Sequence, residues 1–457
     1  MDRSNILGEE KIGKLLLKFS VPAIIGMLVN AFYSVVDRIF VGKGVGPEAL
    51  SGIAISFPIP LIIMAFSMLV GIGATSLISI RLGQHRKEDA ERIVGNSLTL
   101  LLLISVVISL VTFLFMDGLL IQFGASQEVL PYARTFVKVL LWGTVFQSIG
   151  FGMNNFIRAE GNPKVAMFTM ILGAVLNIIL NPIFIFVLKL GVAGSALATV
   201  ISQMVTSIWV LYYFLSDQSS LKLHFVNLKL DKLIIREIVA IGVSPFSMQI
   251  AASVITVIFN KSLAFYGGDS AIAAMAVING IVMMIFMPVF GINQGAQPII
   301  GYNYGARKYK RVRQTLWLGI LGATGFMVLG FLVTHLIPYG LMSLFTSDPE
   351  LIRVGVEGLK IYLVMLPIIG LQIAVVNYFQ ATGQPKKSLF LSLSRQLIFL
   401  IPALLILPRF YGLIGVWMAG PVSDVVSTFV TAILLFFDLK RLGRLEKQEQ
   451  EPVYAEA

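Results

Sequence analysis

The chain has 457 residues, of which 57% are hydrophobic and only 13% are charged. Soluble domains carry about twice that share of charged residues, and apolar stretches of about 20 residues can cross a bilayer. The sequence contains no Cys and three His, which excludes a disulfide framework and a metal site built from Cys or several His side chains. We therefore expect an all-α membrane protein that has no cofactor and is not an enzyme.

Apolar stretches of bilayer-spanning length follow one another along the whole chain. Twelve are predicted to be transmembrane helices, at about 15–41, 49–78, 91–116, 130–157, 164–188, 192–216, 232–262, 270–302, 312–337, 352–380, 387–408 and 412–438. They predict an N-terminal six-helix lobe at 1–216, a cytoplasmic linker at 217–231, a C-terminal lobe at 232–440 and a cytoplasmic tail at 441–457.

Short loop motifs recur in the second half of the chain at a constant offset in sequence number. Arg-Leu-Gly-Gln-His-Arg-Lys at 81–87 recurs as Asn-Tyr-Gly-Ala-Arg-Lys at 303–308, and Gly-Asn-Pro-Lys at 161–164 recurs as Gly-Gln-Pro-Lys at 383–386. A constant offset over separate loops indicates a duplicated membrane unit, which is typical of secondary transporters. Because each copy holds an even number of helices, both copies enter the membrane from the same side. The expected fold is twelve transmembrane helices in two parallel-repeat six-helix lobes around a central cavity.

The formal net charge of +11 reflects an uneven distribution of basic residues. Of the 35 Lys and Arg residues, 25 flank the expected helices on one side, 8 lie on the other, and Arg38 and Arg395 lie within helices. By the positive-inside rule both termini are cytoplasmic, so the charge indicates membrane topology and not a nucleic-acid surface. We expect no cleavable signal peptide, and the sequence has no Walker-type phosphate loop, which favours a multi-pass protein of the cytoplasmic (inner) membrane that is not driven directly by ATP.

Polar side chains form stripes on three expected helices of the first lobe. The stripes are Asn30, Tyr33, Ser34 and Asp37; Met170, Ala174, Asn177 and Asn181; and Ser195, Thr199, Ser202 and Thr206. A carboxylate beside amide and hydroxyl oxygens suits a proton or a small hard cation, which makes Asp37 the candidate ion-binding group. The alternative for Asp37 is a structural ion pair or an interfacial carboxylate. Ser195, Ser202 and Thr206 are expected to be small helix-packing residues.

Two charged residues in the second lobe, Arg395 and Asp424, are expected at similar depth in the last two helices. Isolated charges at membrane depth are costly, so we expect them to form a mutual ion pair. A role of Asp424 in ion coupling is the alternative.

Three motifs carry a resemblance to a known family. Gln-Gly-Ala-Gln-Pro-Ile-Ile-Gly-Tyr-Asn-Tyr-Gly-Ala at 294–306 resembles a signature of the multidrug and toxic compound extrusion (MATE) family. Gly-Asn-Pro-Lys at 161–164 and Val-Asp-Arg-Ile-Phe-Val-Gly at 36–42 are similar to its prokaryotic DinF/MepA-like branch. The resemblance spans the whole chain, and it implies an antiporter that exports organic cations, drugs or other amphipathic compounds in exchange for H⁺ or Na⁺ by alternating access.

The resemblance also implies roles for individual positions in the first lobe. The implied cation-coupling residues are Asp37, Asn177, Asn181 and Thr199. The implied lining of the substrate cavity is Pro22, Met27, Asn30, Tyr33, Asn154 and Met170. Members of this branch often carry Asp at the position of Asn181, so here Asp37 alone can titrate, which favours H⁺ over Na⁺.

A lipid-linked precursor flippase of related two-lobe architecture is the alternative function. Such flippases tend to have a strongly cationic cavity, whereas Arg38 and Arg395 are the basic residues expected at membrane depth here. We expect the protein to act as a monomer in membrane lipid, with H⁺ or Na⁺ and small organic substrates as its partners and with no nucleic acid.

Overall fold

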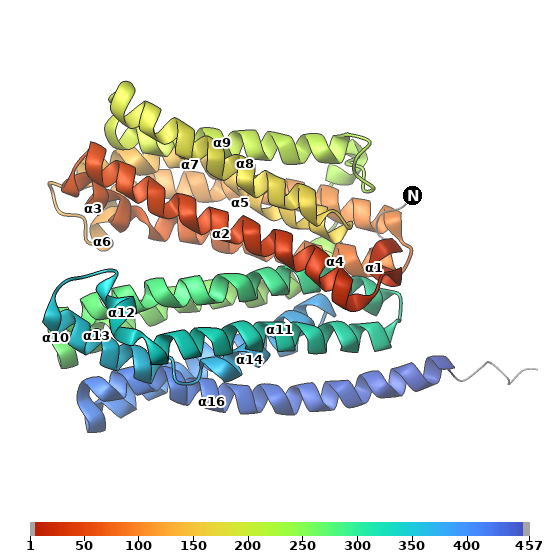
Figure 1. Cartoon of the computed structure of the whole chain (residues 1–457). Coiled ribbons are helices and arrows are strands. Elements are labelled where there is room, and N and C mark those ends of the chain that lie inside the picture. The colour runs from red at the N-terminus through yellow and green to blue at the C-terminus, as the bar shows by residue number, and fades with distance from the viewer. Residues whose placement is uncertain (1–4, 451–457) are drawn as a thin grey trace, which may run out of the picture. The chain divides into compact units, whose positions relative to one another are not determined.

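The structure is a computed structural model that describes residues 5–450, and within that range it consists of helices and their connections (Figure 1). Residues 451–457 of the expected tail lie outside the described part. The elements are α1 (Asn5–Glu9), α2 (Ile12–Gly44), α3 (Pro47–Ser56), α4 (Pro58–Gly83), α5 (Lys87–Leu114), α6 (Met116–Gln122), α7 (Leu130–Ala159), α8 (Pro163–Pro182), η1 (Ile183–Val187), α9 (Gly191–Leu215), η2 (Phe225–Leu228), α10 (Lys232–Gly305), α11 (Tyr309–Leu336), α12 (Pro338–Ser343), α13 (Pro349–Tyr362), α14 (Leu366–Ala381), α15 (Pro385–Leu393), η3 (Ser394–Leu400) and α16 (Ile401–Gln450).

The number of membrane spans follows from how these helices break. In the described chain, nine helical segments are long and apolar enough to cross a membrane, and the pair α13 and α14, bent by 55°, is a tenth candidate. Two of the nine each contain two helices that meet at a glycine with non-helical backbone angles, Gly268 in α10 and Gly412 in α16. Counting these helices separately gives the twelve spans that the sequence predicts.

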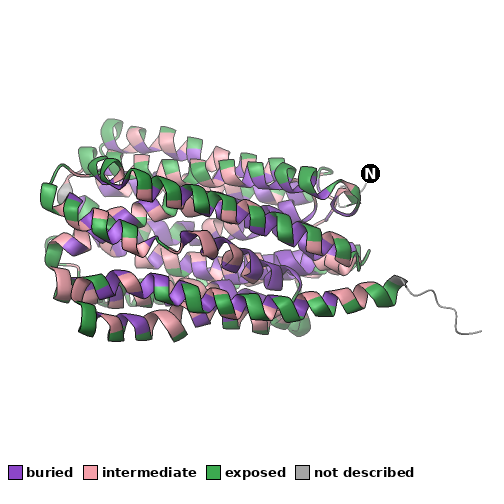
Figure 2. Cartoon of the chain, turned by 60° about the horizontal axis from the view of Figure 1, so that its bottom comes forward, coloured by how far each residue is buried: buried purple, intermediate pink, exposed green. Residues whose placement is uncertain are grey.

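The protein has large apolar side chains on its outer surface as well as in its core. Trp142 is 82% exposed, and Phe113 and Leu103 are also exposed. Figure 2 shows buried and exposed residues alternating along the same helices. Apolar exposure on this scale is expected where lipid, and not water, covers the protein.

The backbone repeats the duplication that the loop motifs indicate. Gly46 and Gly268, which stand at the same offset as those motifs, both have positive φ angles, of 116° and 66°. His85 and Arg307 have the same separation and φ angles of 59° and 56°, a left-handed conformation that is uncommon outside glycine. Equivalent positions therefore share unusual geometry, which confirms the internal repeat.

Contacts divide the chain into two compact units. Unit 1 contains Ile25–Phe246 together with a short N-terminal stretch up to Leu7, and unit 2 contains Gly8–Ile24 and the chain from Ser247 onward. The boundaries therefore fall inside α2 and α10 and not at the linker: the first part of α2 packs with unit 2, and the first part of α10 packs with unit 1.

Glycines explain these close helix approaches. In unit 1, a Cβ on Gly73 of α4 would lie 2.2 Å from the carbonyl oxygen of Ile238 in α10. In unit 2, a Cβ on Gly295, the repeat equivalent of Gly73, would lie 2.6 Å from Ser20 Oγ in α2. Neither distance leaves room for a side chain, so glycine at both equivalent positions permits the contact.

The linker after α9 is fastened to unit 1 by a buried carboxylate. Glu160, which follows α7, is 1% exposed and accepts hydrogen bonds from Ser219 Oγ at 2.8 Å, Ser220 N at 3.0 Å and Leu221 N at 3.1 Å. The hydroxyl of Tyr213 donates to its other oxygen. Farther along the linker, Lys222 N, Asn227 O and Leu228 O are bound by side chains of α5.

We expect this attachment to weaken as pH rises. Burial raises the pKa of Glu160 above its ordinary value of 4.5, and its hydrogen-bond donors oppose that shift only in part. A carboxyl whose folded-state pKa is raised contributes stability that is complete below its unfolded pKa and is lost as pH rises through the folded pKa. Hydrogen-exchange protection of the Ser220 and Leu221 amides should therefore fall from about pH 4.5 upward in the native protein and lose this dependence in Glu160→Gln.

The matched control is Asp217→Asn, which alters an exposed carboxylate of the same linker paired with Lys222 at 2.8 Å. It should retain the native dependence of the two amides on pH. Protection that changes with pH in the same way in Glu160→Gln and in the native protein would contradict the assignment to Glu160.

Candidate ion-coupling site in unit 1

Three helices of unit 1, α2, α8 and α9, carry the polar stripes. Pro163 stands at the first position of α8, where its missing N–H costs no helical hydrogen bond. A Cβ on Gly26 of α2 would lie 2.7 Å from Met170 Sδ of α8, so this glycine lets α2 pass close to α8. At its far end α8 reaches Pro182 and continues as the π-helical turn η1. Such turns are frequent at functional sites.

Asp37 of α2 meets α8 and α9 at one carboxylate oxygen. Its Oδ1 accepts a hydrogen bond from Asn181 Nδ2 and another from Ser195 Oγ at 3.1 Å. One turn away, Asn177 Nδ2 donates to Thr199 Oγ1 at 3.1 Å. The four residues proposed from the sequence for the cation site therefore lie together in unit 1, on three helices.

Two oxygens of this cluster have no hydrogen-bond partner among the described residues. They are Oδ1 of Asn177 and Oδ1 of Asn181, and both side chains are buried, at 3% and 0% exposure. A buried unsatisfied acceptor is costly unless a proton donor, an ion or water satisfies it. The cluster thus offers unsatisfied amide oxygens beside a carboxylate, and such oxygens can bind a proton or a hard cation.

Ser195 contacts the candidate site, although the sequence interpretation favoured a packing role for it. The small-residue pattern of α9 favours packing for it, whereas the structure places its hydroxyl on Asp37. Ser202 and Thr206 donate to backbone carbonyls of their own helix, which agrees with a packing role. Ser195 lies one turn before Thr199, and this spacing is the signal that could have identified it.

Arg38 forms no close ion pair with Asp37 in the described chain. Its guanidinium carbon lies 5.8 Å from the centre of the Phe57 ring, a cation–π arrangement. The hydrogen bonds to Asp37 therefore come from neutral donors, and Arg38 acts on it only through space.

The residues expected to line a substrate cavity are distributed over α2, α7 and α8. In unit 1, Met27 and Tyr33 of α2 and Met170 of α8 are half-buried, and Asn30 is exposed. Asn154 of α7 is buried at 4% exposure, and its Oδ1 lacks a partner in the described chain. Pro22 belongs to the part of α2 that packs with unit 2.

The charged pair expected in the second lobe lies within unit 2. Arg395 Nε and Asp424 Oδ1 are 2.7 Å apart, and the two side chains are 28% and 6% exposed. Over residues 5–450, no three His, Cys, Asp or Glu side chains come together in a way that could hold a metal ion.

Comparisons with known proteins agree with this architecture. The sequence profile of the MatE family matches residues 22–183 and again 246–405, once in each repeat. The chain is 28% identical to the multidrug export protein MepA of Staphylococcus haemolyticus over 434 residues, 95% of either protein.

Solved structures are similar over almost the full length. The MATE multidrug transporter DinF-BH is 43% identical, with a TM-score of 0.89 over 94% of this chain and 97% of that one. An outward-facing multidrug resistance transporter of the MATE family is 27% identical, with a TM-score of 0.90 over 98% and 99%. The chain belongs to the MatE family, the family of the MATE multidrug transporters.

Proposed function

We propose that the protein is a secondary active antiporter that exports organic cations, drugs or other amphipathic compounds in exchange for H⁺ by alternating access. The observation that supports this best is the set of contacts around Asp37: a carboxylate held by Asn181 and Ser195, with no basic side chain among its hydrogen-bond partners in the described chain. The membership of the family supports the transport of small drug-like substrates.

In this proposal Asp37 alternates between a protonated and an ionised form. The ionised form accepts hydrogen bonds from Asn181 and Ser195. The protonated form can donate its new O–H to an unsatisfied amide oxygen of the cluster, so each form has suitable partners. Substrate and proton would then compete for the same lobe, which couples outward movement of one to inward movement of the other.

H⁺ is preferred over Na⁺ because the cluster contains a single carboxylate. Na⁺ bound among Asp37, Asn177, Asn181 and Thr199 would meet one formal negative charge, whereas a proton needs one carboxylate and no cage. Na⁺ is the coupling ion that the experiments below must distinguish from H⁺.

Asn181→Asp should strengthen Na⁺ binding. The new carboxylate would touch Asp37, and two such groups cannot both ionise without a cation between them. Transport by this variant should become more dependent on Na⁺ than native transport, measured as organic-cation efflux at fixed pH with and without Na⁺. Asn177→Asp should increase the Na⁺ dependence less, because Asn177 contacts Thr199 and not Asp37. Equal Na⁺ dependence in the native protein and Asn181→Asp would contradict this assignment of the ligands.

We further propose that Met27, Asn30, Tyr33, Asn154 and Met170, together with Pro22, contact the transported compound. Met side chains repack around ligands of varied shape, which suits a multidrug carrier. The bias of basic residues supports a protein of the cytoplasmic membrane with both termini inside. We also propose that it acts as a monomer.

Everted membrane vesicles provide the test of this function. In vesicles with an imposed pH gradient, adding an organic cation such as tetraphenylphosphonium should dissipate the gradient when the protein is present. Vesicles without the protein set the background. A gradient that is insensitive to a panel of organic cations, in the presence of correctly inserted protein, would argue against the proposal.

A further inference from the structure

The internal repeat identifies the place in unit 2 that corresponds to the Asp37 cluster. Gly46 and Gly268 define the offset between the copies, and this offset pairs Asp37 with Phe259. Gly191 and Gly412, which both have a φ angle of 57° before the last helix of their copies, define an offset that is one position shorter.

With either offset, the residues that correspond to Asn177, Asn181, Ser195 and Thr199 have no oxygen or nitrogen in their side chains, apart from the indole N–H of one Trp. They are Ile398, Phe399, Pro402, Ala403, Val416, Trp417, Gly420 and Pro421. The corresponding positions of the second copy therefore supply none of the oxygen ligands of the first.

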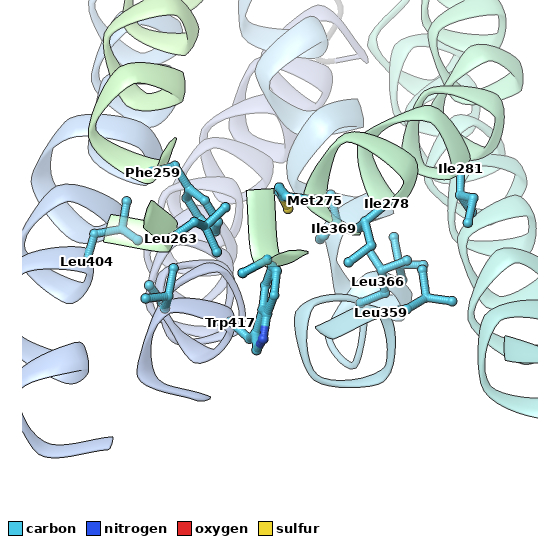
Figure 3. Close-up of a cluster of buried hydrophobic side chains, with 14 of the residues drawn as sticks. Phe259, Leu263, Met275, Ile278, Ile281, Leu359, Leu366, Ile369, Leu404 and Trp417 are labelled. Atoms are coloured by element: carbon cyan, nitrogen blue, oxygen red, sulfur yellow. The ribbon is translucent and has the colours of Figure 1, made fainter. Parts of the chain in front are cut away.

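Apolar packing occupies this place in unit 2. The rings of Phe259 and Trp417 are 6.5 Å apart, and both side chains are buried, at 4% and 1% exposure. Figure 3 shows Phe259, Leu263, Leu404 and Trp417 within the same cluster of buried side chains. These side chains supply no oxygen ligand, so the second copy of the site cannot hold an ion as the first can.

The paired charges of unit 2 lie about one helical turn along the sequence from positions that correspond to the Asp37 cluster. Arg395 precedes Phe399 by one turn, and Asp424 follows Gly420 by one turn. Besides the 2.7 Å ion pair, Ser423 Oγ donates to the carbonyl oxygen of Arg395 at 2.6 Å. Arg395 also belongs to the π-helical turn η3, so local backbone geometry and a hydrogen bond to α16 both hold it beside Asp424.

The carboxylates of the two units therefore have different hydrogen-bond partners. Asp37 has neutral partners, and its sequence neighbour Arg38 lies against Phe57. Asp424 has a guanidinium, which remains protonated at any physiological pH. The other titratable side chain that acts on Asp424 in the described chain is Tyr362 of α13.

We propose that Arg395 is a tethered cation that serves Asp424 in place of an exchangeable ion, about one helical turn from the apolar equivalent of the Asp37 site. Unit 2 would then carry a built-in positive charge beside Asp424, whereas unit 1 takes its positive charge from solution at Asp37. This inference rests on the proposed role of Asp37, and it assigns one exchangeable ion per transport cycle to these two carboxylates. Removing the tethered charge should convert Asp424 into a second group that needs a proton or cation from solution.

The test measures protonated carboxyl groups in purified protein at neutral pH by infrared spectroscopy. Arg395→Gln should gain one protonated carboxyl group per protein over the native chain, and Arg395→Gln/Asp424→Asn should not. The gain should also occur in a background that carries Asp37→Asn, because it arises in unit 2. The proposal would be overturned if Arg395→Gln gained no protonated carboxyl group, or if the gain persisted in Arg395→Gln/Asp424→Asn.

If Arg395→Gln does not fold, a transport measurement on a double variant tests the proposal instead. The double variant Arg395→Gln/Asp424→Asn leaves neither charge of the pair unbalanced, and it should exchange the same number of H⁺ per tetraphenylphosphonium in proteoliposomes as the native protein. A changed ratio would show that the pair takes part in ion exchange and would overturn the tethered-cation assignment. Loss of coupling in Asp37→Asn alone tests the proposed function separately, so the two failures can be told apart.

Discussion

Asp37→Asn should abolish coupled export while the protein still folds and inserts. Asn has nearly the shape of Asp and can keep the hydrogen bond from Ser195 through its amide oxygen, so the packing of α2 against α9 is preserved. It cannot exchange a proton, which removes the one charge of the cluster that can alternate. Uptake of an organic cation into everted vesicles should fall to the level of vesicles without the protein, at equal amounts of inserted protein.

A suitable control for this variant is Asp269→Asn, which neutralises an exposed carboxylate of α10. It changes the net charge by the same amount and should leave uptake unchanged. Export at the native rate by Asp37→Asn would show that another group carries the coupling ion.

The ion pair of unit 2 should give an asymmetric loss of stability. Asp424→Asn leaves a guanidinium that cannot lose its proton, and breaking a buried pair in this way typically costs about 3 kcal/mol or more. Arg395→Gln leaves a carboxyl that can take up a proton, so its cost should be smaller. The double variant, which removes both charges of the pair, should be closest to the native stability.

Thermal unfolding in detergent measures this order. Arg134→Gln provides a control, because it breaks an ion pair with Asp117 of similar length, 2.7 Å, in which both side chains are largely exposed. It should shift the midpoint little, since exposed pairs contribute about 0–1 kcal/mol. Single variants at Arg395 and Asp424 that unfold at the native temperature would show that the pair contributes no net stability.

The helices could be predicted from the sequence because their length and composition are dictated by the bilayer. Loop motifs that recur at a constant offset also revealed the duplication, since glycines at equivalent turns keep the same backbone requirement. The site around Asp37 could be predicted for a similar reason. Residues spaced by three and four share one face of a helix, and only a few helix faces of the first lobe are polar.

The remaining features depend on contacts between segments far apart in the chain. Ser195 fits a packing pattern, and its bond to Asp37 of α2 depends on how α2 and α9 pack. Glu160 looks like an ordinary loop carboxylate in the sequence, yet the linker folds back over it. The division of α2 between two units likewise depends on close approach to Gly295, a contact that no local pattern specifies.

The central claim, that Asp37 exchanges H⁺ for an organic cation, is tested most directly in proteoliposomes. The purified protein is reconstituted, and tetraphenylphosphonium movement is measured with either a pH gradient in the absence of Na⁺ or a Na⁺ gradient with the pH gradient clamped to zero. We predict uphill movement driven by the pH gradient, lost in Asp37→Asn, and none driven by Na⁺. Movement driven by the Na⁺ gradient alone, or driven by the pH gradient and unchanged in Asp37→Asn, would contradict the account.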